Sequence, residues 1–254
     1  MAPAPSATVT LDRARYEDVA VVLAAHGSSR RPDANAVVGA HAERMRRDGP
    51  FPRVSTAFLL GDTSPAAAGR TIRDAATVLI VPYLMSDGYL AGEIAAQIST
   101  SLDDTSRVIV AEPVGTHDGV TAIVRHTGER ALIRAGFDAT ASTLVVAAHG
   151  STSRPESKVA AMAHVDRLRA TGAFAHVALA MLEEPPLLDD VLASLDGPAV
   201  VVGLFAAPGG HAIDDVQKAV AERGHPQLVD AGPIGTDPRM AEIALLRAHE
   251  ALAL

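Results

Sequence analysis

The stretch Val21-Val22-Leu23-Ala24-Ala25-His26-Gly27-Ser28-Ser29-Arg30 is repeated near the middle of the chain as Leu144-Val145-Val146-Ala147-Ala148-His149-Gly150-Ser151-Thr152-Ser153-Arg154. Two further blocks repeat in the same order, one around Tyr89 and His211 and one around Thr116 and Thr236. The three pairs of blocks lie 123, 122 and 120 residues apart. Matching blocks at nearly constant spacing indicate an internal duplication. Each copy begins with an apolar run that ends at a histidine.

Short apolar runs alternate with amphipathic segments in both copies. Eight runs predict strands: Val19–Ala25, Val54–Leu59, Val78–Tyr83, Val108–Ala111, Leu144–Ala148, Val177–Leu182, Ala199–Phe205 and Gln227–Asp230. Continuous apolar runs are typical of parallel strands that are covered on both faces. Helices are predicted over Asp33–Arg47, Glu156–Arg169 and Asp237–Ala251, with Thr236 as a candidate N-cap of the last one.

The sequence therefore predicts an α/β fold with two similar halves. Each half is expected to be a four-stranded parallel sheet in the order 2-1-3-4, with helices on both faces. We expect a disordered lead over residues 1–17, a first half over 18–138 and a second half over 139–254. The join falls around Gly136–Ser142 without a long linker, so the halves should contact each other tightly.

Composition narrows the function classes. The formal net charge is −8 and no long Lys/Arg block occurs, which argues against a nucleic-acid surface. The absence of cysteine excludes disulfides and thiolate metal sites, so a metal would be held by histidine and carboxylate. No segment has the length of a membrane span or of a signal-peptide core, and we expect a cytoplasmic protein with no membrane partner.

Three loops of the second half combine residues that can bind metal. His149 follows its first predicted strand, His211 follows the third, and Glu183 and Glu184 follow the second. With the order 2-1-3-4, these loops meet where the strand order reverses, which is where ligands bind in such sheets. Two histidines and a carboxylate fit a divalent first-row cation and leave coordination positions open. The same groups can also exchange protons near neutral pH.

Each of these features also has a simpler interpretation. A histidine after a strand is often only a loop residue, Glu183-Glu184 before two prolines can be a solvated turn, and Gly209-Gly210 can serve a tight turn. The remaining histidines are interpreted as surface residues: His41, His117, His126, His164, His176, His225 and His249. No phosphate-binding loop and no dinucleotide fingerprint occurs, so no nucleotide cofactor is expected.

The strand-His-Gly-Ser-x-x-x-Pro openings (His26 to Pro32 and His149 to Pro155) and the Leu-Phe-x-x-x-Gly-Gly-His loop ending at His211, with Asp215 four residues on, resemble the class II tetrapyrrole chelatases. The likeness is greatest to the sirohydrochlorin cobalto- and ferrochelatases of the long, internally duplicated type, over residues 18 to 252. It implies two flavodoxin-like halves that insert Co²⁺ or Fe²⁺ into a tetrapyrrole without ATP, in cobalamin or sirohaem biosynthesis.

The resemblance also implies roles for single residues. His149 and His211 would hold the metal and accept protons, with Glu183 or Glu184 assisting. The first half departs from the pattern, because Tyr89 stands where a histidine is expected and Leu60-Gly61 replaces the acidic pair. That half is therefore expected to be a supporting lid with a degenerate site. The residues expected to contact the substrate are His26, Ser28, Arg30, Tyr89, Ser151, Arg154, Gly209 and Gly210.

Three arginines follow the two His-Gly-Ser blocks: Arg30, Arg31 and Arg154. A guanidinium group matches a carboxylate in bidentate geometry, so these arginines are expected either to pair with carboxylates on the ring periphery or to cap loop carbonyls. The metal is expected to be a substrate, with Co²⁺ ahead of Fe²⁺ and with Ni²⁺ or Zn²⁺ also acceptable to such ligands. The protein is expected to be a monomer or a small homo-oligomer. Two other functions stay open: a non-catalytic tetrapyrrole or metal carrier, and a hydrolase that uses Ser151 with His149.

Overall fold

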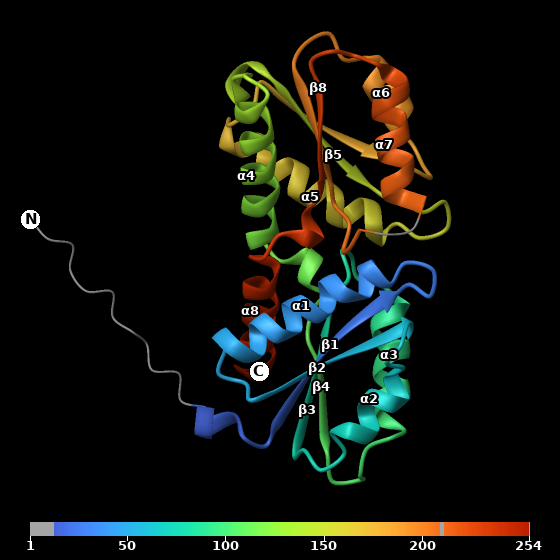
Figure 1. Cartoon of the computed structure of the whole chain (residues 1–254), viewed down its shortest axis with the longest axis vertical. Helices are drawn as coiled ribbons and strands as arrows, with labels where there is room; N and C mark the ends of the chain where they lie inside the picture. Colours follow the sequence, from blue (N-terminus) through green and yellow to red (C-terminus); the bar gives the residue numbers. More distant parts are fainter. Residues whose placement is uncertain (1–12, 209–210, 254) are drawn as a thin grey trace, which may run out of the picture.

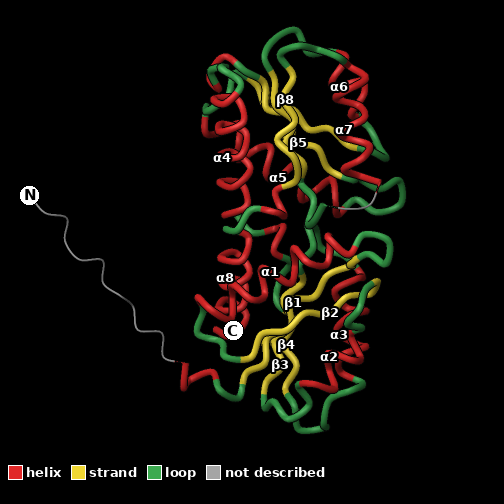
Figure 2. The backbone as a smooth tube through the Cα atoms, in the orientation of Figure 1, coloured by secondary structure: helices red, strands yellow, loops and turns green. Residues whose placement is uncertain are grey.

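The protein folds into two four-stranded parallel sheets, one from each copy of the repeat (Figures 1 and 2). The computed structural model describes residues 13–208 and 211–253, and for residues 211–213 the backbone alone. The strand orders are β2-β1-β3-β4 and β6-β5-β7-β8, so the predicted order 2-1-3-4 is confirmed in both halves. The strands are β1 (Val19–Gly27), β2 (Arg53–Leu60), β3 (Thr77–Pro82), β4 (Arg107–Val110), β5 (Thr143–Ala148), β6 (His176–Met181), β7 (Ala199–Gly203) and β8 (Leu228–Pro233).

Helices connect the strands and cover both faces of each sheet. The α-helices are α1 (Pro32–Asp48), α2 (Pro65–Thr71), α3 (Tyr89–Ser99), α4 (Gly119–Arg134), α5 (Glu156–Thr171), α6 (Leu188–Ala193), α7 (His211–Arg223) and α8 (Met240–Ala253). The 3-10 turns are η1 (Arg13–Tyr16), η2 (Val114–Thr116), η3 (Ala139–Ala141) and η4 (Ile234–Thr236). No helix of the described chain combines the length and the apolar composition that a bilayer span requires.

The alternation of side chains along each strand divides the core into three apolar clusters. In β1, Val21 and Leu23 face one way and Ala20 and Val22 the other, and all four are fully buried. The outer faces of the two sheets each have a cluster of their own, under α2 and α3 in the first half and under α6 and α7 in the second. The inner faces share one cluster that runs through both halves. The expected tight contact between the halves is therefore present.

The last helix of each repeat is exchanged between the halves. Helix α4 follows β4 in the chain but packs on β7, β8 and α5 of the second half. Helix α8 ends the second repeat and packs on α1 and β3 of the first half. Figure 1 shows α4 beside the second sheet and α8 beside the first. The boundary at 138/139 stays a prediction about the two repeats in sequence, whereas each packed unit takes its last helix from the other repeat.

Three local predictions are wrong. His41 and His164, interpreted as surface residues, are buried, because each hydrogen-bonds a backbone carbonyl of the other half. Thr236 is not an N-cap, since its hydroxyl donates to the Pro233 carbonyl (3.0 Å) and α8 begins only at Met240. Part of the predicted disordered lead is ordered: Arg13–Tyr16 forms η1, and the Tyr16 ring packs on Phe51 with 4.9 Å between ring centroids.

Candidate functional site

Both repeats place a histidine at the carboxyl end of a central strand. His26 lies near the end of β1, and His149 follows β5. The chain turns sharply at the next residue, Gly27 or Gly150, whose φ angles of 71° and 77° favour glycine. A Cβ at Gly27 would also overlap with the Leu60 carbonyl. The local sequence His-Gly therefore fixes both imidazoles at the same edge of their sheets, and both side chains are exposed.

In the second half, His149 lies beside Glu183. The His149 Nδ1 is 3.6 Å from the Glu183 Oε1, and about half of each side chain is exposed, 55% and 52%. Glu183 follows β6, the neighbour of β5, so the sheet order brings the two residues together as predicted. At 3.6 Å the two groups are too far apart for a direct hydrogen bond, but an imidazole and a carboxylate this close can interact electrostatically and can ligate one cation.

Glu184 is directed elsewhere. Its side chain is only 16% exposed; Oε1 accepts a hydrogen bond from the backbone N–H of Ser151 (3.0 Å), and Oε2 lies 3.4 Å from the Lys158 ammonium. Lys158 also donates to the Pro185 carbonyl (2.5 Å). The carboxylate of Glu184 therefore holds the loop after His149 in place, while the carboxylate of Glu183 remains beside the imidazole. The sequence could not separate these two neighbouring glutamates.

The first half lacks the carboxylate pair. Leu60 occupies the position that corresponds to Glu183 and is 46% exposed. The backbone contact of the imidazole is common to both halves: His26 Nδ1 lies 3.1 Å from the Gly27 carbonyl, and His149 Nδ1 lies 3.3 Å from the Gly150 carbonyl. The loop is held by the buried amide of Asn35, which accepts from the Ser28 N–H (2.9 Å) and donates to the Ser28 carbonyl (3.1 Å). Sequence reasoning missed Asn35 and Lys158, because nothing in their local sequence shows which loop they contact.

The two serines of the His-Gly-Ser blocks stabilise their own loops. Ser28 Oγ accepts from the backbone N–H of Arg31 (3.1 Å) and of Arg30 (3.3 Å). Ser151 Oγ accepts from the Ser153 N–H (3.3 Å) and lies equally far from the Ser153 hydroxyl. Among the described contacts, Ser151 forms no hydrogen bond with His149. This geometry does not support the serine hydrolase.

Both histidines line a cavity of about 600 Å³ between the halves. Its wall combines the loop from His26 to Arg30 with His149 and with the second-half segment Phe205–Ala207. The exposed Leu60 contributes apolar surface, and the fully buried Tyr83 borders the cavity. The volume lies within the range of roughly 300–1,000 Å³ that is usual for small-molecule sites. The site thus opens toward a space that can take an organic ligand.

Two arginines at equivalent places of the repeat reach across to the opposite half. Arg31 forms an ion pair with Asp214 at the start of α7 (3.0 Å). Arg154 stacks on the ring of Tyr89 at the start of α3, with the guanidinium carbon 4.3 Å from the ring centroid. A smaller cavity of about 220 Å³ lies at this second contact and also borders Ser151. The predicted substrate contacts Arg154, Tyr89 and Ser151 are therefore brought together, and Arg30 lines the larger cavity.

Three further residues of the predicted site, Gly209, Gly210 and His211, lie wholly or partly outside the residues that the structure describes. Gly209 and Gly210 lie outside the described residues, and for His211 the structure places the backbone at the first residue of α7 but not the side chain. Among the side chains that are described, no three His, Asp or Glu residues converge as a metal site. The backbone of His211 lies in the loop layer after β7, the neighbour of β5, as the sequence predicts.

Comparisons with known proteins agree with this architecture. The family model of CbiX matches residues 20–131 and again residues 143–251. A probable sirohydrochlorin cobaltochelatase of Halobacterium salinarum is 28% identical over 91% of both chains. The structure of CbiX described as the terminal enzyme of sirohaem biosynthesis in denitrifying bacteria is 24% identical, with a TM-score of 0.74, over 91% of this chain and 99% of that one. SirB of Bacillus subtilis with Fe³⁺ is 20% identical, with a TM-score of 0.77, over 92% and 96%. The two solved structures share the fold.

Proposed function

Because the chain belongs to the CbiX family, we propose that it inserts a divalent metal, Co²⁺ or Fe²⁺, into sirohydrochlorin or a related tetrapyrrole without ATP. The observation that carries the proposal is the pairing of His149 with Glu183, 3.6 Å apart, where His149 borders the cavity between the halves. The Halobacterium relative, named as a sirohydrochlorin cobaltochelatase, supports the same substrate class.

Metal insertion needs groups that bind a cation and accept protons at the same place. Two pyrrole N–H bonds break, the ring nitrogens take the cation, and two protons pass to the protein. In our proposal, His149 and Glu183 present the metal and accept these protons, and His211 completes the ligand set from the first residue of α7. Nitrogen and oxygen donors without thiolate allow release of the metal, because a closed thiolate site would hold it more tightly.

We assign Glu183 as the assisting carboxylate and Glu184 as a positioning residue. The carboxylate of Glu184 is occupied by the Ser151 N–H and by Lys158, so it is not available to a metal without a rearrangement of the loop. Its hydrogen bond fixes the loop that carries His149. The role of Glu184 is thus to hold the imidazole in place for the ring.

The tetrapyrrole is proposed to enter between the halves. Arg31 and Arg154 hold Asp214 and Tyr89 across this opening, and a guanidinium group can exchange such partners for a ring carboxylate in bidentate geometry. The first half acts as a supporting lid, with His26 as its remaining site residue. Since one chain contains both halves, a monomer provides the whole proposed site. Among the acceptable metals, cobalt is proposed ahead of iron.

Anaerobic metallation assays with sirohydrochlorin and Co²⁺, Fe²⁺, Ni²⁺ or Zn²⁺ test the proposal, with absorbance reporting the metallated ring. A chelatase forms many product rings per protein molecule, whereas a tetrapyrrole or metal carrier forms no more than one. A Ser151→Ala variant serves as a control for the hydrolase, since it should retain metallation. No turnover with any of the four metals would refute the enzyme and leave the carrier.

A further inference from the structure

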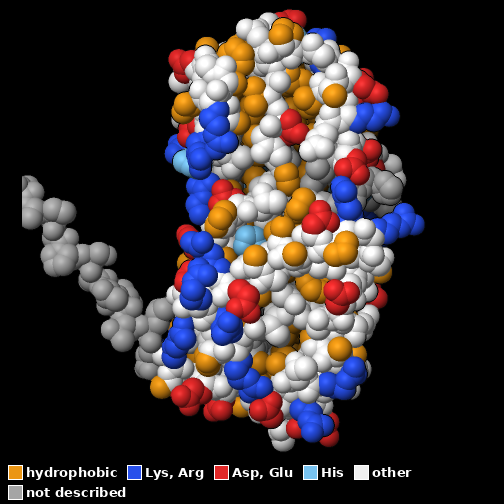
Figure 3. All heavy atoms as spheres, in the orientation of Figure 1, with side chains coloured by type: hydrophobic (Ala, Val, Ile, Leu, Met, Phe, Trp, Pro, Cys, Tyr) orange, Lys and Arg blue, Asp and Glu red, His pale blue; other side chains and the backbone are white. Residues whose placement is uncertain are grey.

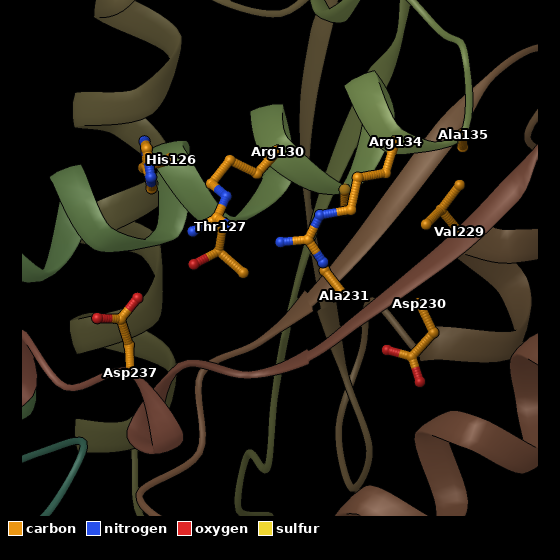
Figure 4. Close-up of a pocket in the computed structure, with 10 residues that line it drawn as sticks. His126, Thr127, Arg130, Arg134, Ala135, Val229, Asp230, Ala231 and Asp237 are labelled. Atoms are coloured by element: carbon orange, nitrogen blue, oxygen red, sulfur yellow. The ribbon is translucent and has the colours of Figure 1, made fainter.

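A third cavity lies on the second half and shares no lining residue with the two cavities described above. It has a volume of about 440 Å³ and lies between α4 and β8 (Figure 4). Strand β8 is the last strand of its sheet, so one row of its backbone groups has no strand neighbour. The ionisable residues that line it are His126, Arg130, Arg134, Asp230 and Asp237.

The α4 wall of this cavity is cationic. His126, Arg130 and Arg134 follow one another at intervals of four residues and thus share one face of the helix, along about 12 Å of its axis. In Figure 4 the guanidinium groups of both arginines extend into the space between α4 and β8. Figure 3 shows Lys and Arg side chains gathered along the edge of the molecule where α4 lies.

Neither arginine of the cavity has an ion-pair partner within the described residues. Arg125, on another face of α4, is by contrast paired with Glu129, 3.6 Å away. Arg130 and Arg134 are both exposed and can therefore accept an anion from solution. Thr127 adds a hydroxyl donor to the same wall.

The two carboxylates in the cavity are already engaged. Asp230 accepts a hydrogen bond from the Gly232 N–H (2.8 Å), and in Figure 4 its carboxylate points away from Arg134. Asp237 receives two hydrogen bonds from the Arg239 guanidinium, of 2.9 Å and 2.6 Å. Burial acts to raise the pKa of Asp237, but these bonds hold it below its usual value, so the pair stays charged and mutually compensated. Asp230 keeps its negative charge, but the two guanidinium groups of Arg130 and Arg134 outweigh it, so the net formal charge of the cavity lining is positive.

The other copy of the repeat lacks this feature. The residues of α8 that correspond to His126 and Arg130 are Leu246 and Glu250, and Leu246 is 47% exposed. Glu250 pairs with Arg247 (2.9 Å). Both copies fold in the same way, so the fold itself does not require the cationic wall of α4.

We propose that this cavity binds a small molecule with two anionic groups, phosphate or carboxylate, spaced by about one helical turn. Two guanidinium groups on adjacent turns match two such groups bidentately, and Val229 and Ala231 provide an apolar surface for what joins them. Because α4 comes from the first repeat and β8 from the second, the ligand contacts both. Its binding should raise the Tm of the whole chain.

Calorimetric titration of the full chain tests this site, with inorganic pyrophosphate and with succinate as separate metal-free probes at constant ionic strength. We expect at least one probe to bind with a Kd below about 1 mM and to raise the Tm. Arg130→Gln and Arg134→Gln should each weaken that binding by about tenfold, since each removes one charged donor pair. Whichever probe binds more tightly identifies phosphate or carboxylate as the preferred group.

Two control variants locate the bound probe. Arg125→Gln removes the same charge from the same helix outside the cavity, and Arg154→Gln removes a cation from the opening between the halves. Both should keep the wild-type Kd. The proposal is overturned if either control weakens binding as much as Arg134→Gln does, if Arg130→Gln and Arg134→Gln both keep the wild-type Kd, or if neither probe binds with a Kd below about 1 mM.

Discussion

His41 and His164 occupy equivalent places in the two repeats, and each donates a hydrogen bond of 2.7 Å to a carbonyl of the opposite half. His41 reaches Gly235 and His164 reaches Gly115, and these two glycines also correspond to each other. A carbonyl oxygen only accepts, so the Nε2 atom of each ring carries the proton. Burial lowers the pKa of both histidines, which favours neutral imidazoles at the junction.

Removing one of these donors should destabilise the protein. In the wild-type protein the His164 ring contacts the Gly115 carbonyl through Nε2 and the Thr121 hydroxyl through Nδ1 (2.9 Å). In His164→Leu both of these buried polar groups lose their partner. A buried polar group without a partner costs about 1–3 kcal/mol, and we expect a loss of that size in the free energy of unfolding. Urea denaturation measures it. His164→Gln, whose amide can still donate to Gly115, should lose less; equal losses in the two variants would contradict the role of the hydrogen bond.

The same histidines predict a loss of stability in mild acid. Their folded-state pKa values lie below the ordinary value of about 6.5, chiefly through burial, although Asp237 near His41 and Asp118 near His164 act in the opposite direction. As the pH falls below about 6.5, the unfolded chain therefore binds more protons than the folded chain does. The free energy of unfolding then falls by at most about 1.4 kcal/mol per pH unit for each histidine.

Urea midpoints at pH 7.5, 6.5 and 5.5 measure this slope. The double variant His41→Gln/His164→Gln should show a much flatter dependence over that window. The pKa of the Asp237 carboxyl is also lowered, but its contribution is lost only under more acidic conditions, below about pH 4. A slope that the double variant retains in full would place the acid sensitivity elsewhere.

The two site histidines should differ in their contribution to metallation. His149 lies beside Glu183, whereas the corresponding neighbour of His26 is Leu60. We therefore expect His149→Ala to reduce kcat by at least about a hundredfold, the scale of a lost acid–base group, and His26→Ala by only a fewfold. Steady-state metallation assays give both values. The opposite ranking would move the active site to the first half.

Glu183 and Glu184 should give different defects. Glu183→Gln keeps the shape but removes the charge beside His149, so we expect lower kcat and weaker Co²⁺ binding with an unchanged Tm. Glu184→Ala removes the acceptor of the Ser151 N–H and the partner of Lys158, and should lower the Tm along with activity. Glu184→Gln can still accept from Ser151 and should stay closer to wild type. If Glu184→Gln abolished Co²⁺ binding while Glu183→Gln did not, the two assignments would be reversed.

Gly235 should not tolerate a side chain. A Cβ at this position would overlap with the carbonyl group of Ala206, in the segment that lines the cavity between the halves. Gly235→Ala should therefore lower both the Tm and the metallation rate. Gly39→Ala is the matched control, because no atom lies within 4 Å of the added Cβ in helix α1. That control should be neutral or stabilising by about 0.5–1 kcal/mol. Equal behaviour of the two variants would contradict the packing argument.

The sequence predicted the sheets well because the repeat and the apolar runs both reflect backbone topology. The runs around Val21 and Val145 are continuous since both faces of β1 and β5 are covered, and the order of the strands places the loop of His149 beside that of Glu183. Strand ends shifted by a residue or two, as for β7, which ends at Gly203 and not at Phe205.

Other features depend on contacts that no local pattern encodes. The apolar residues of α4 indicate that one face of the helix is buried. They do not indicate that this face packs on the second sheet. His41 is buried because its partner, the Gly235 carbonyl, lies 194 residues away in the chain. Glu183 and Glu184 are neighbours with the same chemistry, and only the direction of each side chain tells them apart.

The exchange of α4 and α8 has a consequence for synthesis on the ribosome. The inner face of the first sheet is covered in part by a helix that is translated after all eight strands, Met240–Ala253. At about 5–20 residues per second, many seconds pass between the emergence of β4 and that of α8. During this interval the nascent first half exposes apolar surface to chaperones and to other chains. Ribosome-bound chains that stop short of Met240 should therefore remain sensitive to proteases in their first half.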